Sequence, residues 1–254
     1  MVLDQFKLDG KVALVTGGGR GLGKSMAQSL AEAGADLILV SRQLKILEEA
    51  AHEMELLGRR ALPIAADITK YDEVERATRQ ALDYFGKIDI LVNNSGMGVE
   101  KTVLELTPED WDNVLDLNLK AVFLCCKSVG AHMVNRREGK IINISSMFAF
   151  IASTSISSYC ASKGGMVQLT KALALEWARY NIQVNALCPG YFITDLNRDF
   201  FNSEKGKDYA KQRVPMRRLG DPAELGGMLV YLASPASSYV TGAAFVIDGG
   251  QTVM

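Results

Sequence analysis

Short apolar runs alternate with longer helix-like segments along the whole chain, and this alternation limits the possible folds. The runs are Val12–Thr16, Asp36–Ser41, Ala61–Ala65, Ile88–Asn93, Lys140–Ser145, Ile182–Leu187 and Ala244–Asp248. They are apolar throughout, as expected of parallel strands that helices cover on both faces. The helix-like segments are Leu22–Ala33, Gln43–Leu57, Tyr71–Phe85, Thr107–Arg136, Tyr159–Tyr180 and Pro222–Leu232. Unbroken alternation of this kind predicts an α/β fold with a doubly wound, mostly parallel seven-stranded sheet of the Rossmann type.

Composition and charge narrow the class of protein further. The 254 residues contain no Pro/Gly/Ser-rich linker, charge block or internal repeat, so we expect a single domain over residues 1–254. A net charge of −1 is unlike a nucleic-acid binder, which needs a basic surplus to neutralise phosphates. No run approaches the roughly 18 apolar residues of a membrane helix, and no secretory signal is visible at the start. We therefore expect a cytoplasmic protein that binds neither nucleic acid nor a membrane.

The cysteines and histidines form no disulfide or metal pattern. The cysteines are Cys125, Cys126, Cys160 and Cys188. Because no C-x-x-C pair occurs among them, we expect reduced thiols that are mostly buried. The two histidines, His52 and His132, have no partner at metal-ligand spacing. No metal site is therefore expected, and a Ser-His-Asp hydrolase is disfavoured.

A glycine-rich turn follows the first predicted strand. It consists of Thr16-Gly17-Gly18-Gly19-Arg20-Gly21-Leu22-Gly23. Glycines permit positive φ angles and let backbone N–H groups approach a pyrophosphate at the N-terminus of the next helix. Because this turn lies between a predicted strand and a predicted helix near the N-terminus, it predicts a dinucleotide-binding site.

Later motifs extend this pattern over essentially the whole chain. They are Asn93-Asn94-Ser95-Gly96, Asn118, Ser146, Tyr159-Cys160-Ala161-Ser162-Lys163, Pro189-Gly190 followed by Thr194, and Asp248-Gly249-Gly250. In their order and spacing, and with the T-G-x-x-x-G-x-G turn, they strongly resemble the short-chain dehydrogenase/reductase family. Ser95 departs from the family, which usually has Ala there, and we expect the change to be tolerated. The resemblance implies an NAD(P)(H)-dependent oxidoreductase that interconverts a secondary alcohol and a ketone.

The residue types themselves support that chemistry. Tyr159 and Lys163 are four residues apart and share one face of a helix. A nearby ammonium and an oxidised nicotinamide are expected to lower the tyrosine pKa from its usual value of about 10, making Tyr159 a general acid/base. Ser146 can hydrogen-bond the same substrate oxygen, and its spacing to Tyr159 favours it over the rival Ser145. From the resemblance, Lys163 also holds the nicotinamide ribose, and Asn118 holds a water in a proton relay.

The stretch after the second predicted strand bears on the choice of cofactor. It lacks the carboxylate that NAD-preferring sites place there, and Arg42 offers a planar fork suited to a 2′-phosphate. With Ser41 as the expected N-cap, Arg42 would lie in the first turn of a helix, where a cation opposes the helix dipole. Arg20 is likewise expected at a helix N-terminus, so the two cations suggest an anion between them. The alternative is that both point into water. We expect NADP(H) in preference to NAD(H), with NAD(H) as the other possibility.

Further cofactor contacts follow from the family pattern. Asp67-Ile68 resembles an adenine-contacting pair, the Asn93–Gly96 turn would pass beneath the cofactor, and Thr194 would lie near the carboxamide. The complete expected set is Gly17, Gly19, Arg20, Gly21, Leu22, Gly23, Ser41, Arg42, Asp67, Ile68, Asn94, Ser95, Gly96, Tyr159, Lys163, Pro189, Gly190 and Thr194.

The substrate is less constrained than the reaction. The expected substrate contacts are Ser146, Phe148, Tyr159, Tyr191, Phe192 and Leu196. This mostly apolar wall would suit a cyclic ketone. Two stretches, Gly190–Asn197 and Glu176–Ala178, nevertheless resemble the gluconate 5-dehydrogenase-like subgroup and imply a sugar acid or polyol. A sugar acid needs a cation for its carboxylate, and the candidates, each of which could instead be a surface charge, are Arg198, Lys205, Arg213 and Arg217.

Two alternatives remain on the same framework. The 3-oxoacyl-carrier-protein reductases are the first, with Arg136, Arg137 and Lys140 as a basic patch for an acidic carrier. A non-catalytic, cofactor-sensing scaffold is the second, although such proteins lose the catalytic Tyr or Lys that this chain keeps.

Two further expectations concern the irregular segment late in the chain and the oligomeric state. The region at about 191–218 is expected to close as a lid over the substrate, excluding water from hydride transfer. The alternative is a static helix with Phe200 and Phe201 in the core. From the resemblance, we expect a homotetramer packed through two long helices and the C-terminal segment.

Overall fold

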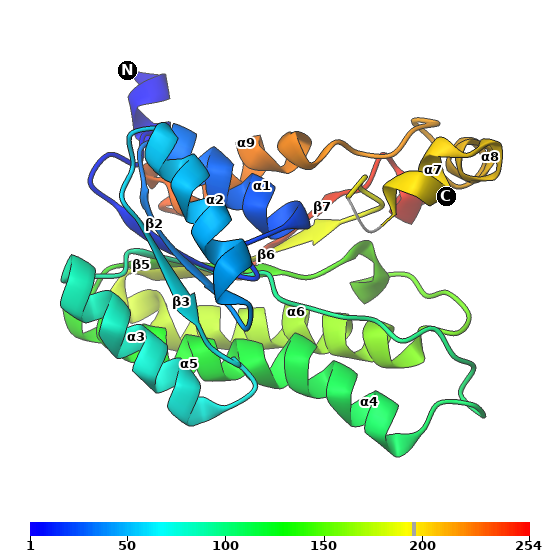
Figure 1. Cartoon of the computed structure of the whole chain (residues 1–254), viewed down its shortest axis with the longest axis horizontal. Helices are drawn as coiled ribbons and strands as arrows, with labels where there is room; N and C mark the ends of the chain where they lie inside the picture. The colour runs from blue at the N-terminus through cyan, green and yellow to red at the C-terminus, as the bar shows by residue number, and fades with distance from the viewer. Residues whose placement is uncertain (195–196) are drawn as a thin grey trace.

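The computed structural model describes residues 1–194 and 197–254, and its centre is a seven-stranded sheet in the order β3-β2-β1-β4-β5-β6-β7 (Figure 1). The strands are β1 (Val12–Thr16), β2 (Asp36–Ser41), β3 (Ala61–Ala65), β4 (Ile90–Asn93), β5 (Gly139–Ile144), β6 (Ile182–Pro189) and β7 (Ala244–Ile247). Each neighbouring pair is parallel. The order reverses between β1 and β4, which creates a crevice at the carboxyl ends of these strands, where α/β folds bind ligands.

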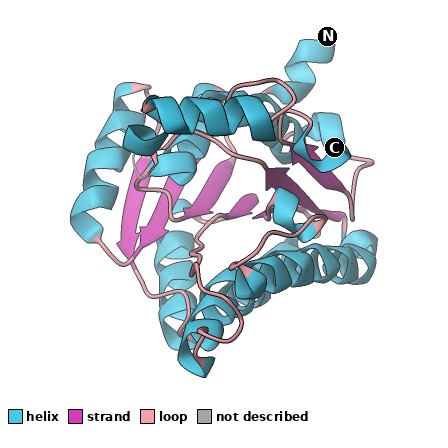
Figure 2. Cartoon of the chain, turned by 90° about the vertical axis from the view of Figure 1, so that its right-hand side faces the viewer, coloured by secondary structure: helices cyan, strands magenta, loops and turns pink. Residues whose placement is uncertain are grey.

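Helices cover both faces of this sheet (Figure 2). They are α1 (Gly21–Glu32), α2 (Leu44–Leu56), α3 (Tyr71–Phe85), α4 (Pro108–Leu115), α5 (Ala121–Arg136), α6 (Ser157–Trp177), α7 (Arg198–Asn202), α8 (Glu204–Arg213) and α9 (Gly226–Ala233). None of the helices in the described part of the chain is long and apolar enough to cross a membrane.

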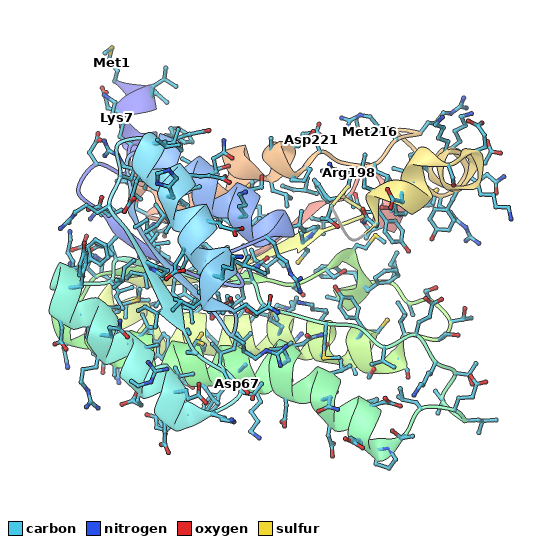
Figure 3. The ribbon with its side chains drawn as sticks, viewed as in Figure 1. Met1, Lys7, Asp67, Arg198, Met216 and Asp221 are labelled. Carbon is cyan, nitrogen blue, oxygen red and sulfur yellow. The ribbon has the colours of Figure 1, made fainter. Side chains whose placement is uncertain are left out.

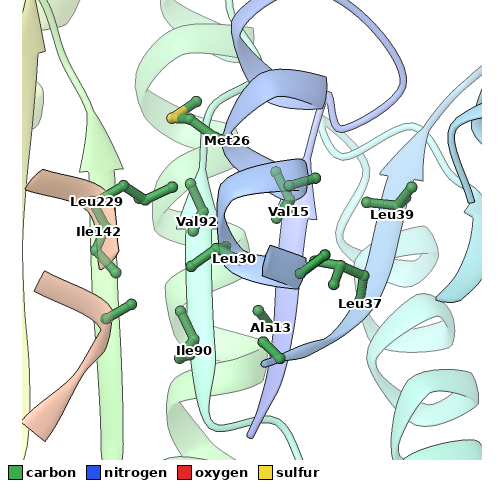
Figure 4. Close-up of a cluster of buried hydrophobic side chains, with 14 of the residues drawn as sticks. Ala13, Val15, Met26, Leu30, Leu37, Leu39, Ile90, Val92, Ile142 and Leu229 are labelled. Carbon is green, nitrogen blue, oxygen red and sulfur yellow. The ribbon is translucent and has the colours of Figure 1, made fainter. Parts of the chain in front are cut away.

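The sheet has a hydrophobic core on each side because successive strand residues point to opposite faces. Ala13 and Val15 of β1 pack in one cluster with residues of α1, α2 and α9, which Figure 4 shows in close-up. Val12 and Leu14 pack in the other cluster, with residues of α3, α5 and α6. Both faces are therefore buried, which confirms the doubly wound sheet expected from runs that are apolar throughout.

The segment expected as one long helix, Thr107–Arg136, is divided in the structure. A π-helical turn, Asp116–Lys120, separates α4 from α5, and the N–H of Ala121 bonds to the carbonyl of Asp116. Such turns inside helices are frequent at functional sites. Asn118, a predicted catalytic residue, lies in the middle of this turn and is fully buried.

Candidate active site

The glycine-rich turn forms a close-fitting cradle between β1 and α1. Gly17 and Gly21 have φ angles of +67° and +54°, which side chains rarely adopt. A Cβ at Gly23 would lie 2.1 Å from the carbonyl oxygen of Gly17, so only glycine lets α1 approach the turn. Arg20 is the exposed N-cap residue of α1. This turn at the start of α1 has the form that a pyrophosphate site requires, and its binding to a cofactor stays a prediction.

Residues from two other strands reach the same cradle. The N–H groups of Asn94 and Ser95, after β4, donate to Thr16 Oγ1 at 3.0 and 3.2 Å, and the Asn94 amide donates to the Thr16 carbonyl at 3.0 Å. Thr194, after β6, lies 3.9 Å from the position of a Cβ on Gly21. The structure therefore brings together three of the predicted cofactor-binding segments, and their geometry fits a dinucleotide.

Arg42 and Asp67 mark the far end of this crevice, after β2 and β3. Asp67 Oδ1 accepts hydrogen bonds from the N–H and hydroxyl of Thr69 at 3.1 and 2.7 Å. Burial raises the pKa of Asp67, but these bonds and the positive charges of Lys70 and Arg42 outweigh burial and hold the pKa below its usual value. Figure 3 labels Asp67 beyond the carboxyl end of β3. The Arg42 guanidinium is thus close enough to Asp67 for their charges to interact.

The expected helix start at Ser41 is wrong. Helix α2 begins at Leu44 with Gln43 as its N-cap, and Ser41 Oγ only accepts a 3.4 Å bond from the Gln43 N–H. Arg42 therefore precedes the helix and does not oppose its dipole from the first turn. The exposed Arg42 guanidinium still suits a 2′-phosphate, but no unfavourable helix position supports an anion there.

Ser146, Tyr159 and Lys163 meet beside the carboxyl end of β5. Lys163 is 3% exposed, its Nζ donates to the Ile144 carbonyl at 2.8 Å, and it lies 5.6 Å from the centre of the Tyr159 ring. Ser146 lies close enough to Tyr159 for its hydroxyl to lower the pKa of the tyrosine. A Cβ at Gly96 would lie 3.6 Å from Lys163 Nζ, which brings the turn after β4 against the same lysine. The predicted catalytic groups and part of the cofactor cradle are therefore contiguous.

The two neighbouring serines differ in their hydrogen bonds. Ser145 Oγ donates to the main-chain carbonyl of Lys163 at 2.9 Å, which attaches β5 to α6. Ser146 Oγ accepts from the Phe148 N–H at 3.2 Å and lies near enough to Tyr159 to act on the pKa of its hydroxyl. Ser146 is thus the serine placed beside the acid/base candidate, as the spacing predicts.

Burial changes the acidity expected for this site. Burial raises the pKa of Tyr159, and the hydrogen bond with Ser146 only partly opposes that effect, so the expected lowering by Lys163 is wrong for the protein alone. Burial also lowers the pKa of Lys163 to about 8. Both shifts have one cause, since a low-dielectric interior disfavours the charged form of each group.

Asn118 joins the catalytic helix to the loop after β4. Its Oδ1 accepts from the Met97 N–H at 2.8 Å, and its Nδ2 donates to the Met97 carbonyl at 2.8 Å and to Ser162 Oγ at 3.0 Å. Ser162 and Met97 were not singled out from the sequence, because only the folded chain shows what they bond to. Both N–H groups of the amide are used, so a relay water of the kind that the resemblance implies would have to bond to the remaining lone pair of Oδ1 or to main-chain groups of the π-helical turn.

Aromatic side chains form a wall next to Tyr159. The Phe148 ring is edge-on to Tyr159 and to Tyr191, with centroid distances of 6.3 and 6.1 Å. Phe192 does not join this wall: it is 5% exposed and packs in the hydrophobic core, because consecutive extended residues point in opposite directions. Leu196, also expected here, lies outside the described residues. Tyr209 of α8, which the sequence did not indicate, bonds to the Tyr191 hydroxyl at 3.0 Å.

This arrangement can move a proton at a substrate oxygen. When bound, a nicotinamide cofactor supplies or accepts the hydride and, when oxidised, adds a positive charge. The Tyr159 hydroxyl is placed to exchange a proton with the substrate oxygen, and Ser146 Oγ to hydrogen-bond that oxygen. The Lys163 ammonium and the added charge favour the phenolate that burial disfavours.

Comparison with known proteins identifies the family. Residues 11–205 match the model of the short chain dehydrogenases. The chain is 42% identical over 253 residues to the 2-dehydro-3-deoxy-D-gluconate 5-dehydrogenase of Escherichia coli (strain K12), covering 98% of each chain. It is 35% identical over 248 residues to the 3-oxoacyl-[acyl-carrier-protein] reductase of Thermotoga maritima, covering 98% of this chain and 100% of the relative. The crystal structure of a gluconate 5-dehydrogenase from Burkholderia cenocepacia J2315 in complex with NADP and tartrate matches with a TM-score of 0.95 and 39% identity over 100% of both chains. With its glycine cradle and its Ser146–Tyr159–Lys163 group, the chain belongs to the short-chain dehydrogenase/reductase family of oxidoreductases.

Proposed function

We propose that this protein is an NADP(H)-dependent oxidoreductase that interconverts a secondary alcohol and a ketone on a sugar acid. The observation that carries the proposal is the grouping of Ser146, Tyr159 and Lys163 beside the glycine cradle. The relatives named for gluconate and 2-dehydro-3-deoxygluconate support the substrate class, since they match nearly the whole chain. Four free cysteines, three of them buried, support a reducing compartment, and we place the protein in the cytoplasm.

A 3-oxoacyl-carrier-protein reductase is the second candidate, supported by the Thermotoga maritima relative. The basic patch considered for an acidic carrier does not favour it. Arg136 is paired with Asp89 at 2.9 Å, and Lys140 donates to Ser237 at 3.0 Å. Lys140 also lies at the amino end of β5, whereas Ser146 follows its carboxyl end. A carrier bound at this patch would be at the wrong end of the sheet. The scaffold alternative is disfavoured by the intact catalytic group.

The first prediction concerns the reaction. In absorbance assays with both cofactors, we expect the highest wild-type kcat/KM for a sugar acid, ahead of polyols, cyclic ketones and acetoacetyl thioesters. Tyr159→Phe keeps the ring but removes the proton, so kcat should fall on the order of 10²–10⁴-fold with little change in cofactor affinity. Tyr84→Phe, at an exposed tyrosine of α3, is the matched control. Retention of more than half the wild-type rate of the chemical step by Tyr159→Phe would contradict the assigned role.

The second prediction concerns the cofactor. A charge-assisted bond from Arg42 to a 2′-phosphate is worth roughly 1.5–3 kcal/mol, so Arg42→Asp should raise the Kd for NADPH more than tenfold and spare or improve NADH binding. Fluorescence titration gives both constants. Arg79→Asp makes the same charge change at an exposed residue of α3 and should leave the NADPH/NADH affinity ratio unaltered. An unchanged ratio in Arg42→Asp would overturn the NADP preference.

The third prediction concerns the lid that we propose at about 191–218. Helix α8 is joined to the rest of the protein mainly by a small cluster of Ala210, Val214 and Leu219, with Tyr191 and Phe201 packed against it. Such a limited contact supports closure when ligands bind. Amides of residues 198–213 should exchange rapidly in the free enzyme and slowly with cofactor and substrate both bound, while those of α3 stay unchanged. Equal protection in the two states would make this segment a static structure.

The fourth prediction concerns assembly, which we propose to be a homotetramer. Phe123 of α5 and Leu175 of α6 are 46% and 84% exposed, and Phe123 also borders an open apolar hollow of about 390 Å³ between α4, α5 and α6. At the sheet edge, Val246 of β7 is exposed as well. Light scattering should give a tetramer mass, and the Phe123→Glu/Leu175→Glu variant a smaller mass. Leu56→Glu, on the exposed side of α2, should not change the mass. A monomeric wild type would refute the assembly.

A further inference from the structure

The Tyr191 hydroxyl is held in place by groups that the catalytic role does not use. The Tyr209 hydroxyl donates to it at 3.0 Å, and the two rings meet edge-on with centroids 5.7 Å apart. The Phe201 ring packs against both, at centroid distances of 6.3 Å from Tyr191 and 6.1 Å from Tyr209. Because the two hydroxyls share one hydrogen bond, one of their two protons remains available as a donor to a ligand.

The backbone of Tyr191 is fixed as well as its hydroxyl. Its N–H donates to Gln251 Oε1 at 3.3 Å, and its carbonyl accepts from the Gly220 N–H at 2.9 Å. The next residue, Phe192, lies buried against Gly220. Both backbone polar groups of Tyr191 are thus bonded, and its ring contacts the Phe148 ring, which in turn contacts Tyr159. This places it along the aromatic wall that begins at the catalytic tyrosine.

Opposite charges approach Tyr191 from two elements. Arg213 is on α8, four residues after Tyr209 and therefore on the same helix face. Glu100 is in the loop after β4. Burial raises the pKa of Tyr191, the Arg213 charge opposes this shift, and the Glu100 charge adds to it, so both charges act at the phenol. Within residues 1–194 and 197–254, neither Arg213 nor Glu100 has an ion-pair partner closer than 4.0 Å.

We propose that Arg213 and the Tyr191 hydroxyl bind the carboxylate of the sugar-acid substrate, with Tyr209 as the positioning residue. This inference rests on the proposed function and selects one cation from the four that the sequence offered. The planar guanidinium suits a carboxylate, and the phenol adds a neutral donor beside it. Glu100 would repel the carboxylate and turn it toward Arg213. The reacting carbon and the carboxylate then lie at opposite ends of an open-chain substrate.

Through Arg213 and Tyr209, α8 would contribute directly to substrate specificity. Arg213 and Tyr209 come from the same segment that we propose as the lid, so a carboxylate held between Arg213 and Tyr191 would attach α8 to the wall. A neutral alcohol of the same length would lack that attachment. The protein would therefore discriminate between acid and neutral substrates through binding, and not through the chemical step.

The test uses the full-length protein with NADP(H). The substrates are gluconate or 2-dehydro-3-deoxygluconate, whichever the wild type turns over faster, and a neutral polyol of the same chain length. Arg213→Met should raise the KM for the sugar acid roughly tenfold to a hundredfold and change its kcat less than threefold, leaving the polyol unaffected. Lys211→Met, at a neighbouring exposed lysine of α8, is the matched control and should behave as the wild type.

Two hydroxyl deletions complete the test. Tyr191→Phe should raise the KM for the sugar acid and spare the polyol. Tyr209→Phe keeps the ring packing and should raise the same KM by a smaller factor; a purely structural role would alter both substrates equally. An unchanged preference for the sugar acid in Arg213→Met would overturn this inference while leaving the proposed function intact. A wild type that prefers the polyol or an acyl thioester would overturn both.

Discussion

Lys163 carries an amino group into the interior at the carboxyl end of β5, where Nζ donates to the Ile144 carbonyl. Burial lowers the pKa of this amine to about 8, so its charged form depends on what surrounds it. Ser145 attaches the main chain of Lys163 to β5, and Gly96 leaves room beside Nζ. Burying an amine costs stability. We therefore attribute the position of Lys163 beside Tyr159 to the chemistry of the site and not to the fold.

The two sides of the active site differ in how extensively the rest of the fold supports them. Ser146 and Tyr159 lie on elements packed against the central sheet, where strand and helix backbones are fixed by many neighbours. The opposite wall comes from the segment after β6, in which α8 is supported by a small separate cluster. Proteins that share this fold can therefore keep the same reacting centre while the residues of the less supported wall differ according to the substrate.

Much of the architecture was predictable because it depends on local patterns. Val12–Thr16 is apolar on both faces because helices cover both sides of β1, and its bounds were predicted correctly. The predictions failed where a shift of one or two residues along the chain changes what a side chain does. Ser41 has the side chain of an N-cap, but the backbone enters α2 two residues later. Phe192 is next to Tyr191, yet alternation in an extended segment directs it into the core.

The sequence by itself determined the order of strands and helices, the glycines that allow α1 to approach β1, and the pairing of Tyr159 with Lys163, since all of these follow from spacing along the chain. Only the tertiary structure decided which distant groups meet: Asn118 bonds to Met97 and Ser162, and Tyr209 reaches Tyr191 from α8. It also decided the acidity of the site. Burial is a property of packing between segments far apart in sequence, so no pattern of neighbouring residues could have predicted that Tyr159 and Lys163 would both be shifted toward their neutral forms.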